Sequence, residues 1–207
     1  AMKIDYITHG TVPGQSAAAL NILQMCGALA KSRHEVRLLA PWKFWRPSTW
    51  GKPDAIRGSS YFQIMRLPDF PVGRRWVFDA RAMARARLRK VDLVYCRKLS
   101  TADAACKNGI RCILELHSMY DVRRWPLLAK AVFESEMLAR VVVITDALKA
   151  DMGSFLGLSS RYDKIRVVRD AVDIDKMEMA EAKVPPRPSV GYFGTVSLAK
   201  GCMSLLN

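Results

Sequence analysis

Short apolar runs alternate with segments of helical periodicity along most of this chain, and this alternation constrains the fold more than any other feature. In the first cycle, residues 3–8 form an apolar strand pattern, and Ser16 is a good N-cap for an Ala- and Leu-rich helix that runs to about Ser32. Residues 35–40 form the next strand. Parallel strands need a crossover of this kind, which is nearly always right-handed. The pattern therefore predicts an α/β fold with a doubly wound, Rossmann-like parallel sheet.

Later parts of the chain repeat this cycle. Further strands are predicted at residues 61–67, 92–96, 111–116, 140–144 and 165–168. Further helices are predicted at residues 74–90, 99–108 and 123–139, and from a cap at Thr145 or Asp146 to about Leu156.

The segment 184–207 predicts the start of a second domain. It opens with VPPRP, whose three prolines disfavour a helix and stiffen a linker. A short apolar run then ends at Gly194, and an apolar pattern with helical spacing begins at Lys200. We therefore expect residues 1–183 to form an N-terminal domain. Residues 184–207 would be the hinge, first strand and helix start of a truncated second domain.

The composition is that of a globular protein with an unusual excess of positive charge. Hydrophobic residues make up 50% of the chain, and the formal net charge is +14. No apolar run is as long as a membrane span and no signal peptide is visible, so we expect a cytoplasmic protein. The five cysteines are scattered without a CxxC motif, which indicates reduced thiols. The three histidines are too far apart to indicate a metal site.

The positive charge indicates an anionic partner, which could be a membrane surface, a nucleic acid or a phosphorylated substrate. No common nucleic-acid-binding pattern is present, so we expect no nucleic-acid partner. The predicted helix 74–90 carries seven basic residues and one acid, Asp79. Its basic face either meets solvent or contacts anionic lipid. The face expected against the sheet comprises Val77, Ala80, Ala84, Leu88 and Val91.

An aromatic and basic segment, residues 41–60, precedes that helix. Its aromatic side chains either pack on the edge of the domain or contact an acceptor or a membrane. The candidate residues for an anionic membrane surface or an anionic acceptor are Arg81, Arg85, Arg89, Trp42 and Trp45.

Two loops lie where open α/β sheets bind ligands, at the carboxyl ends of predicted strands. Gly14, Gln15 and Ser16 precede a helix N-terminus, where backbone N–H groups favour anions, although an ordinary turn is the alternative. The loop is not the GxGxxG dinucleotide-binding fingerprint. His117 directly follows the strand 111–116, and such a histidine is either structural or part of a site.

Four segments of the chain form an ordered set: LAKSRHEV at residues 29–36, VVITDALK at 142–149, KIRVVRDAVD at 164–173, and GYFG at 191–194 with Lys200-Gly201 after it. In this order they resemble the N-terminal domain and domain junction of the GT-B glycosyltransferases of family GT4, the group 1 glycosyltransferases. The chain departs from the family pattern at three places. Arg33 replaces a preferred glycine, Asp170-Ala171 replaces an Asn-Gly turn, and Thr195 replaces an arginine that helps to bind the donor diphosphate.

The resemblance implies a retaining transfer of a sugar from a nucleotide-sugar to an acceptor glycan or lipid, without a metal or other cofactor. It implies that His117 faces the donor sugar. Lys200, Thr195 and the amides of Gly14, Gln15 and Ser16 would lie at the donor, and the first domain would mainly hold the acceptor. The family's paired-glutamate motif belongs to the second domain, so we expect this chain alone to be inactive.

Two other functions fit the same residues. A nucleotide-sugar epimerase can share the GT-B fold but uses acid and base residues around the donor. A basic module that binds anionic lipid would need no active site. The sequence leaves open the sugar, the nucleotide, the acceptor and the oligomeric state.

Overall fold

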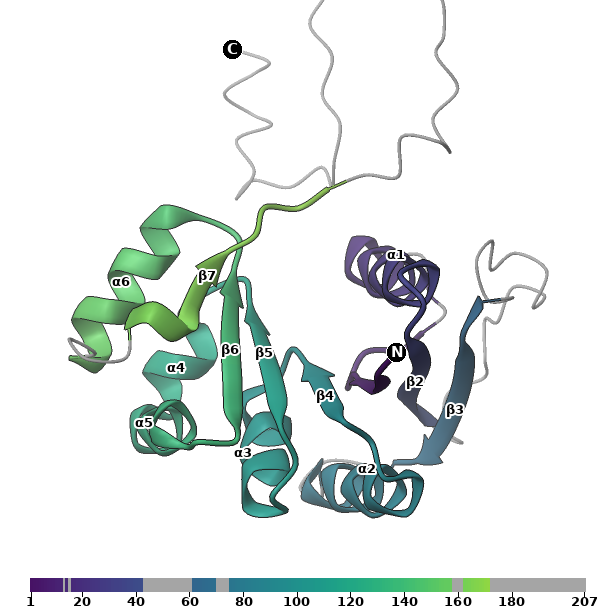
Figure 1. Cartoon of the computed structure of the whole chain (residues 1–207). Coiled ribbons are helices and arrows are strands. Elements are labelled where there is room, and N and C mark those ends of the chain that lie inside the picture. The colour runs from purple at the N-terminus through teal and green to yellow at the C-terminus, as the bar shows by residue number, and fades with distance from the viewer. Residues whose placement is uncertain (13, 15, 43–60, 70–74, 158–161, 172–207) are drawn as a thin grey trace, which may run out of the picture. The chain divides into compact units, whose positions relative to one another are not determined.

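The computed structural model describes residues 1–12, 14, 16–42, 61–69, 75–157 and 162–171. In the described part the chain forms a seven-stranded sheet in the order β3-β2-β1-β4-β5-β6-β7, and neighbouring strands are parallel (Figure 1). The direction of winding reverses between β1 and β4. This confirms the predicted doubly wound α/β sheet. The predicted hinge and second-domain start, residues 184–207, lie outside the described residues.

The strands and helices lie close to their predicted positions. The strands are β1 (Lys3–Ile7), β2 (Glu35–Trp42), β3 (Gln63–Pro68), β4 (Leu93–Cys96), β5 (Cys112–Leu116), β6 (Leu138–Val143) and β7 (Ile165–Val167). The helices are α1 (Ala17–Lys31), α2 (Arg75–Arg89), α3 (Leu99–Lys107), α4 (Tyr120–Arg124), α5 (Pro126–Glu134) and α6 (Asp146–Leu156), with a 3₁₀ turn at Tyr162–Lys164.

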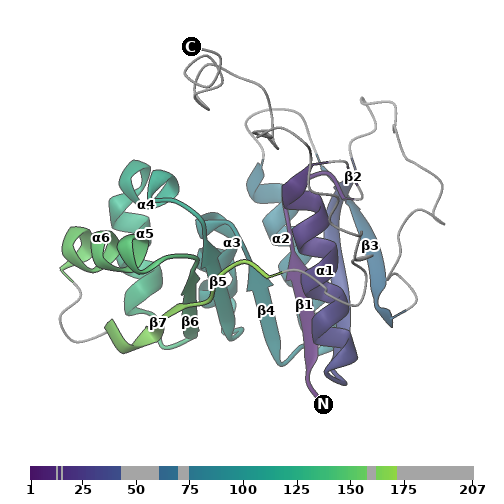
Figure 2. The same ribbon diagram turned by 90° about the horizontal axis from the view of Figure 1, so that it is seen from above.

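Helices cover both faces of the sheet (Figures 1 and 2). In Figure 1, α1 lies above the sheet, and α2 and α3 lie below it. Because successive side chains of a strand point to opposite faces, neighbours in β1 enter different cores. Tyr6 packs in a cluster with Ile22 of α1, whereas Ile7 packs in a cluster with Phe78 of α2 and Leu99 of α3.

Side-chain caps fix the starts of two helices, as predicted. The Ser16 hydroxyl accepts a hydrogen bond from the Ala19 N–H at 3.2 Å at the start of α1. The Thr145 hydroxyl accepts one from the Leu148 N–H at 3.1 Å at the start of α6, so Thr145 rather than Asp146 is the cap. Each cap satisfies an N–H group that has no partner inside its helix.

The end of α1 explains one departure from the family pattern. Arg33 has a φ of 64°, in the left-handed region that side chains other than glycine rarely adopt. The Arg33 N–H bonds to the Ala30 carbonyl at 2.9 Å, and the His34 N–H bonds to the Leu29 carbonyl at 3.3 Å. A glycine would make this turn without strain, which is the physical reason for the family's preference.

The single helix predicted at residues 123–139 was wrong. The chain forms two helices, α4 and α5, that are separated at Trp125. Pro126 has no N–H to continue a helix, but it suits the first position of a new one. Leu138 and Ala139 already belong to β6.

Strand β2 continues two residues beyond its predicted end, through Pro41 and Trp42. Pro41 pairs with Leu67 of β3, whereas the pairing with β1 on the other side ends at Leu39. A proline is tolerated here because the missing N–H has no strand to meet on the β1 side.

Most of the predicted inward face of α2 was also wrong, although Val91 of that set is half-buried and packs against the core. The buried apolar residues are Phe78, Ala82, Met83 and Ala86. The side chain of Leu88 is 77% exposed, and Ala80 and Ala84 are exposed. Both sets have helical spacing, but Phe78 and Met83 bury more apolar area than the alanines of the predicted set.

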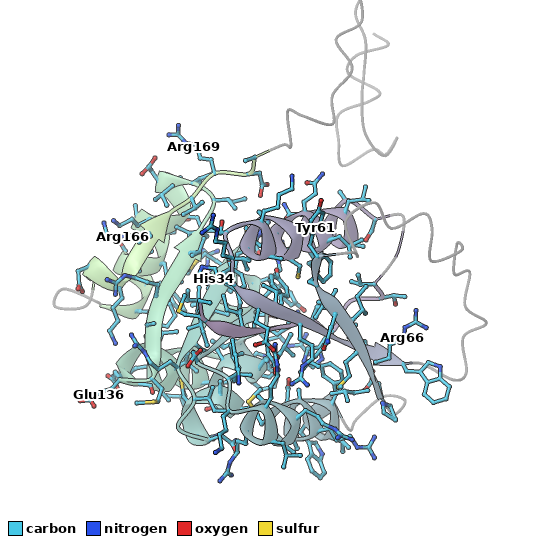
Figure 3. All side chains as sticks on the ribbon, turned by 45° about the vertical axis from the view of Figure 1, so that its right-hand side comes forward. His34, Tyr61, Arg66, Glu136, Arg166 and Arg169 are labelled. Carbon is cyan, nitrogen blue, oxygen red and sulfur yellow. The ribbon has the colours of Figure 1, made fainter. Side chains whose placement is uncertain are left out.

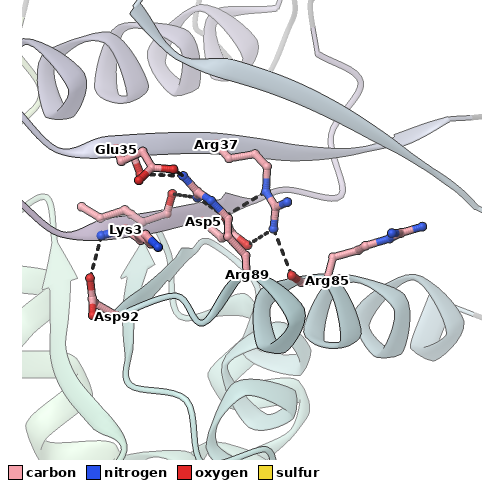
Figure 4. A network of polar contacts seen from close by, with 8 residues as sticks. Lys3, Asp5, Glu35, Arg37, Arg85, Arg89 and Asp92 are labelled. Carbon is pink, nitrogen blue, oxygen red and sulfur yellow. Dashed lines mark hydrogen bonds and ion pairs between the residues drawn. The ribbon is translucent and has the colours of Figure 1, made fainter.

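A buried ionic network holds the last turn of α2 against the sheet (Figure 4). Asp5 of β1 is fully buried, and its carboxylate accepts from Arg37 Nη2 at 2.6 Å and from Arg89 Nη1 at 2.8 Å. Arg89 Nη2 donates to Glu35 Oε1 at 2.6 Å, and Arg37 Nη2 donates to the Arg85 carbonyl at 3.2 Å. The placement of Arg89 among exposed basic residues was therefore wrong, because its guanidinium is held by two carboxylates.

The two outer strands of the sheet carry exposed arginines, Arg66 on β3 and Arg166 on β7 (Figure 3). Charged side chains on outer strands oppose edge-to-edge pairing with other chains. Part of the positive charge therefore has a structural explanation that needs no anionic partner.

Candidate functional site

The carboxyl ends of β4 and β5 bring together a polar cluster. Arg97 directly follows β4, and Glu115 and His117 lie at and just beyond the end of β5. The strands are paired, so these side chains lie close together. They also border the reversal of winding between β1 and β4, which is where open α/β sheets bind ligands.

Glu115 is the centre of this cluster. Its side chain is buried, and its Oε2 accepts a hydrogen bond from the Tyr95 hydroxyl at 2.8 Å. Its Oε1 lies 3.4 Å from Arg97 Nε and also contacts His117 Nε2. Burial and the neighbouring carboxylate raise the pKa of Tyr95, so the phenol remains a donor. A buried carboxylate needs such partners, and Glu115 has three of them.

The same contacts decide which atom of His117 can meet a ligand. Its Nε2 contacts Glu115 Oε1 and lies 2.6 Å from Arg97 Nη2. A ring nitrogen either donates to the carboxylate or accepts from the guanidinium, and either choice occupies Nε2. In the described part of the chain Nδ1 makes no hydrogen bond, so Nδ1 is the atom available to a ligand.

A hollow of about 160 Å³ lies over this cluster. It is lined by Arg97, Lys98, Glu115, Leu116, His117, Ser118, Tyr120 and Asp121. Arg97 Nη1 is buried and makes no hydrogen bond with the described residues, so it is a donor that a polar ligand could satisfy. Lys98 is held by Asp121 at 3.1 Å.

A second histidine, His9, lies at the carboxyl end of β1. Its Nε2 is 2.9 Å from Asp79 Oδ1 and 3.1 Å from the Thr101 hydroxyl oxygen. The hydroxyls of Thr101 and Ser100 both donate to the Asp79 carboxylate, at 2.7 and 3.0 Å. Since Thr101 uses its proton on Asp79, His9 Nε2 must act as the donor, which leaves Nδ1 as an acceptor in the neutral ring.

Sequence reasoning found His117 but not its partners. Arg97 and Tyr95 could have been found only with the strand order, which brings β4 beside β5. No motif or spacing in the sequence marked His9 as a site residue. Asp79 was recognisable as the single acid in a basic helix. It belongs to α2, and its buried side chain faces α3.

The predicted donor loop is described in part. A side chain at Gly14 would bring its Cβ within 2.9 Å of the Thr11 carbonyl, so the turn requires glycine there. The Ser16 hydroxyl oxygen accepts the cap bond of α1. Gln15, Thr195, Lys200 and Trp45 lie outside the described residues.

The residues of the predicted basic and aromatic surface differ in their exposure and in their partners. Arg85 is exposed, and Arg81 donates to the Pro68 carbonyl at 2.9 Å. Trp42 ends β2 and is 50% exposed. No helix in the described ranges is long and apolar enough to cross a membrane. Those ranges also contain no cluster of three or more His, Cys, Asp or Glu side chains that could hold a metal.

The chain is a Rossmann-like α/β domain with a polar cluster, its candidate site, at the carboxyl edge of a parallel sheet. The sequence model of the family described as Glycosyltransferase Family 4 matches residues 19–176, which is more than half of the sequence. The chain belongs to this family. A search of curated protein sequences gave no match.

Solved structures share the fold. A glycosyltransferase from Rickettsia africae has a TM-score of 0.59 and 15% identity over 84% of this chain and 44% of that one. Anabaena HepE, solved with UDP and glucose, has a TM-score of 0.55 and 17% identity over 84% and 46%. UDP-GlcNAc 2-epimerase from Methanocaldococcus jannaschii has a TM-score of 0.51 and 16% identity over 81% and 45%. The chain thus spans less than half the length of each of these proteins. At such low sequence identity, the structural likeness establishes the GT-B type of fold and no shared function.

Proposed function

We propose that this chain is the N-terminal, acceptor-side part of a glycosyltransferase that moves a sugar from a nucleotide-sugar to an acceptor glycan or lipid with retention of configuration. The observation that carries the proposal is the His117 cluster at the carboxyl end of β5. Membership of Glycosyltransferase Family 4 supports a transferase, and HepE, of the same fold, was solved with UDP and glucose.

In this proposal His117 acts on the donor sugar. Glu115 and Arg97 hold the Nε2 side of the ring, which orients Nδ1 toward a sugar hydroxyl. Sugar transfer passes through an oxocarbenium-like centre, so a fixed hydrogen-bonding group beside the sugar stabilises the transition state without reorganising. Glu115 acts through His117 as a positioning residue, and Tyr95 and Arg97 offset the cost of burying its charge.

The departing diphosphate would meet the N-terminus of α1. The first N–H groups of a helix lack partners within the helix, and the end of the helix is partly positive. The Ser16 hydroxyl caps the Ala19 N–H, and the amides of Gly14, Gln15 and Ser16 would contact the anion in this proposal. Lys200 and Thr195 would approach from the second domain, and no metal would be required.

A turnover measurement tests the role of His117. The full-length protein should release UDP from UDP-glucose or another UDP-sugar when acceptor is present, whereas the chain of residues 1–207 should not. His117→Ala in the full-length protein should lower kcat by about 100-fold, the size of effect that loss of a preorganised donor produces. Its melting temperature should stay near that of the wild type.

His34→Ala is the matched control, because His34 lies at the opposite, amino end of the strands, where its Nδ1 accepts from the Met2 N–H. Unchanged turnover in His117→Ala would remove His117 from the site. The anomeric configuration of the product, read by NMR, tests retention. Conversion of UDP-GlcNAc to its epimer without any acceptor would favour the epimerase function instead.

A second proposed function is binding of an anionic membrane through α2, with the protein at the cytoplasmic face. The observation that favours it is an exposed face that combines apolar and basic groups. Trp76 and Leu88 are 68% and 77% exposed, and Arg85 and Arg87 are exposed on the same helix. Tryptophan suits the headgroup region, and each arginine near an anionic surface contributes about 1 kcal/mol.

Vesicle co-sedimentation tests this function. The chain should bind vesicles that contain phosphatidylglycerol, ignore vesicles of pure phosphatidylcholine, and dissociate as salt increases. Arg85→Glu with Arg87→Glu should abolish binding, whereas Arg140→Glu with Arg166→Glu changes the net charge equally on exposed residues of other elements and should retain most of it. Absence of binding at low salt would refute the membrane function and favour a soluble anionic acceptor.

A further inference from the structure

Two thiols far from the polar cluster lie in contact with each other. The Sγ atoms of Cys106, near the end of α3, and Cys112, the first residue of β5, are 3.8 Å apart. Cys112 is fully buried, and Cys106 is half-buried. Among the cysteines of the described part, Cys26 and Cys96 are buried and contact no second sulfur.

The surroundings of Cys106 favour its thiolate. A hydrogen bond from the Cys112 thiol lowers the pKa of Cys106 below that of an ordinary thiol, and the Ser135 hydroxyl and the Lys164 ammonium act in the same direction. The Lys164 ammonium is held nearby, because it donates to the Ser135 carbonyl at 3.0 Å. Burial raises the pKa of Cys26 and of Cys96. A partly exposed thiolate beside a positive charge is the usual setting of a reactive cysteine.

We propose that Cys106 and Cys112 are a peroxide-sensitive thiol pair that closes to a disulfide between α3 and β5. The Cys106 thiolate attacks one oxygen of hydrogen peroxide, the O–O bond breaks, and Cys106 becomes a sulfenic acid while hydroxide leaves. The Cys112 sulfur then attacks the Cys106 sulfur, its proton goes to the departing hydroxyl, and water leaves. The two sulfurs are oxidised by two electrons in total, and hydrogen peroxide is reduced to two waters.

The geometry suits the second step. The sulfurs must approach from 3.8 Å to about 2.05 Å, and the sulfenic acid would form already in contact with its partner. The disulfide would join the end of α3 to the start of β5, at the opposite end of that strand from His117. The inference therefore goes beyond the proposed transferase function and holds for any sugar or acceptor.

Peptide mapping tests the pair directly. Trypsin cleaves after Lys98, Lys107, Arg111 and Arg123, so Cys106 falls on peptide 99–107 and Cys112 on peptide 112–123. The chain is treated with hydrogen peroxide under conditions that leave its circular dichroism unchanged. Remaining thiols are blocked with iodoacetamide, and the protein is digested without reductant. We expect these two peptides to be joined, and dithiothreitol to separate them.

Two variants make the result specific. Cys112→Ala should prevent the link and should slow alkylation of Cys106 by iodoacetamide at pH 7 about five-fold, because the thiolate fraction falls more than its nucleophilicity rises. Cys26→Ala should change neither result. The proposal is overturned if peroxide takes Cys106 to a sulfinic acid with peptide 112–123 unlinked. It is equally overturned if Cys106 links to Cys202, or if the link forms only in urea.

Discussion

Replacing Asp5 with alanine would remove the carboxylate that two guanidinium groups share between β1 and α2 (Figure 4). Arg89 would keep Glu35, but Arg37, whose side chain is only 8% exposed, would keep a single carbonyl contact. A buried charge that loses its partner costs about 3–5 kcal/mol. Domains are stable by about 5–15 kcal/mol, so Asp5→Ala should remove a large part of the stability of this one. For a chain of this size the melting temperature should fall by about 10 °C.

Thermal and urea denaturation followed by circular dichroism measure this loss. Asp92→Ala is the matched control, because Asp92 accepts the Lys3 N–H at 2.7 Å in an exposed position and its loss should cost about 1 kcal/mol or less. Adding Arg37→Met to Asp5→Ala removes the unpaired charge and should recover part of the stability. If Asp5→Ala costs no more than the control, or if Arg37→Met recovers nothing, the network does not hold α2 as argued.

Two further predictions concern single side chains. Arg33→Gly should raise the free energy of unfolding by about 0.5–1 kcal/mol in urea denaturation, because it relieves the φ of 64°, and a loss of stability would contradict the strain argument. The hydrogen bond from Arg89 lowers the pKa of Glu35 from 4.5, so ionised Glu35 favours the folded state above that value and its contribution is lost as the pH falls through the lower folded value. The stability difference between wild type and Glu35→Gln should therefore vanish on acidification, and a difference independent of pH would contradict this reasoning.

Much of the fold could be predicted because the strands of a buried parallel sheet are continuous apolar runs. β4 is buried at every position, and β1 at all but its first. The caps at Ser16 and Thr145 were predictable because hydroxyl side chains compete for free N–H groups. The face of α2 was not, because Ala80, Ala84 and Leu88 form as regular a stripe as the residues that are buried. The choice between two such stripes is made by the size of the side chains and by contacts from distant strands.

Within the candidate site, only His117 could be predicted from its position along the chain. His117 follows a strand, and that suffices to place it at the carboxyl edge of the sheet. Its contact with Glu115 follows from the alternation of side chains along β5, whereas its contact with Arg97 depends on which strand lies beside β5, and the sequence does not specify that order. The same holds for His9 and Asp79, which are 70 residues apart in the chain.

Both histidines at this edge of the sheet share one arrangement. His9 and His117 each place Nε2 on a buried carboxylate, Asp79 or Glu115, and in the described part of the chain neither Nδ1 has a partner. A buried carboxylate hydrogen-bonded to a histidine contributes little net stability compared with apolar residues of similar volume, so stability alone does not account for two such contacts at one edge. What a carboxylate behind a histidine does provide is a fixed ring with one nitrogen directed to whatever binds there. The positions of Asp79 and Glu115 therefore support the proposed ligand site at this edge of the sheet more than a role in its core.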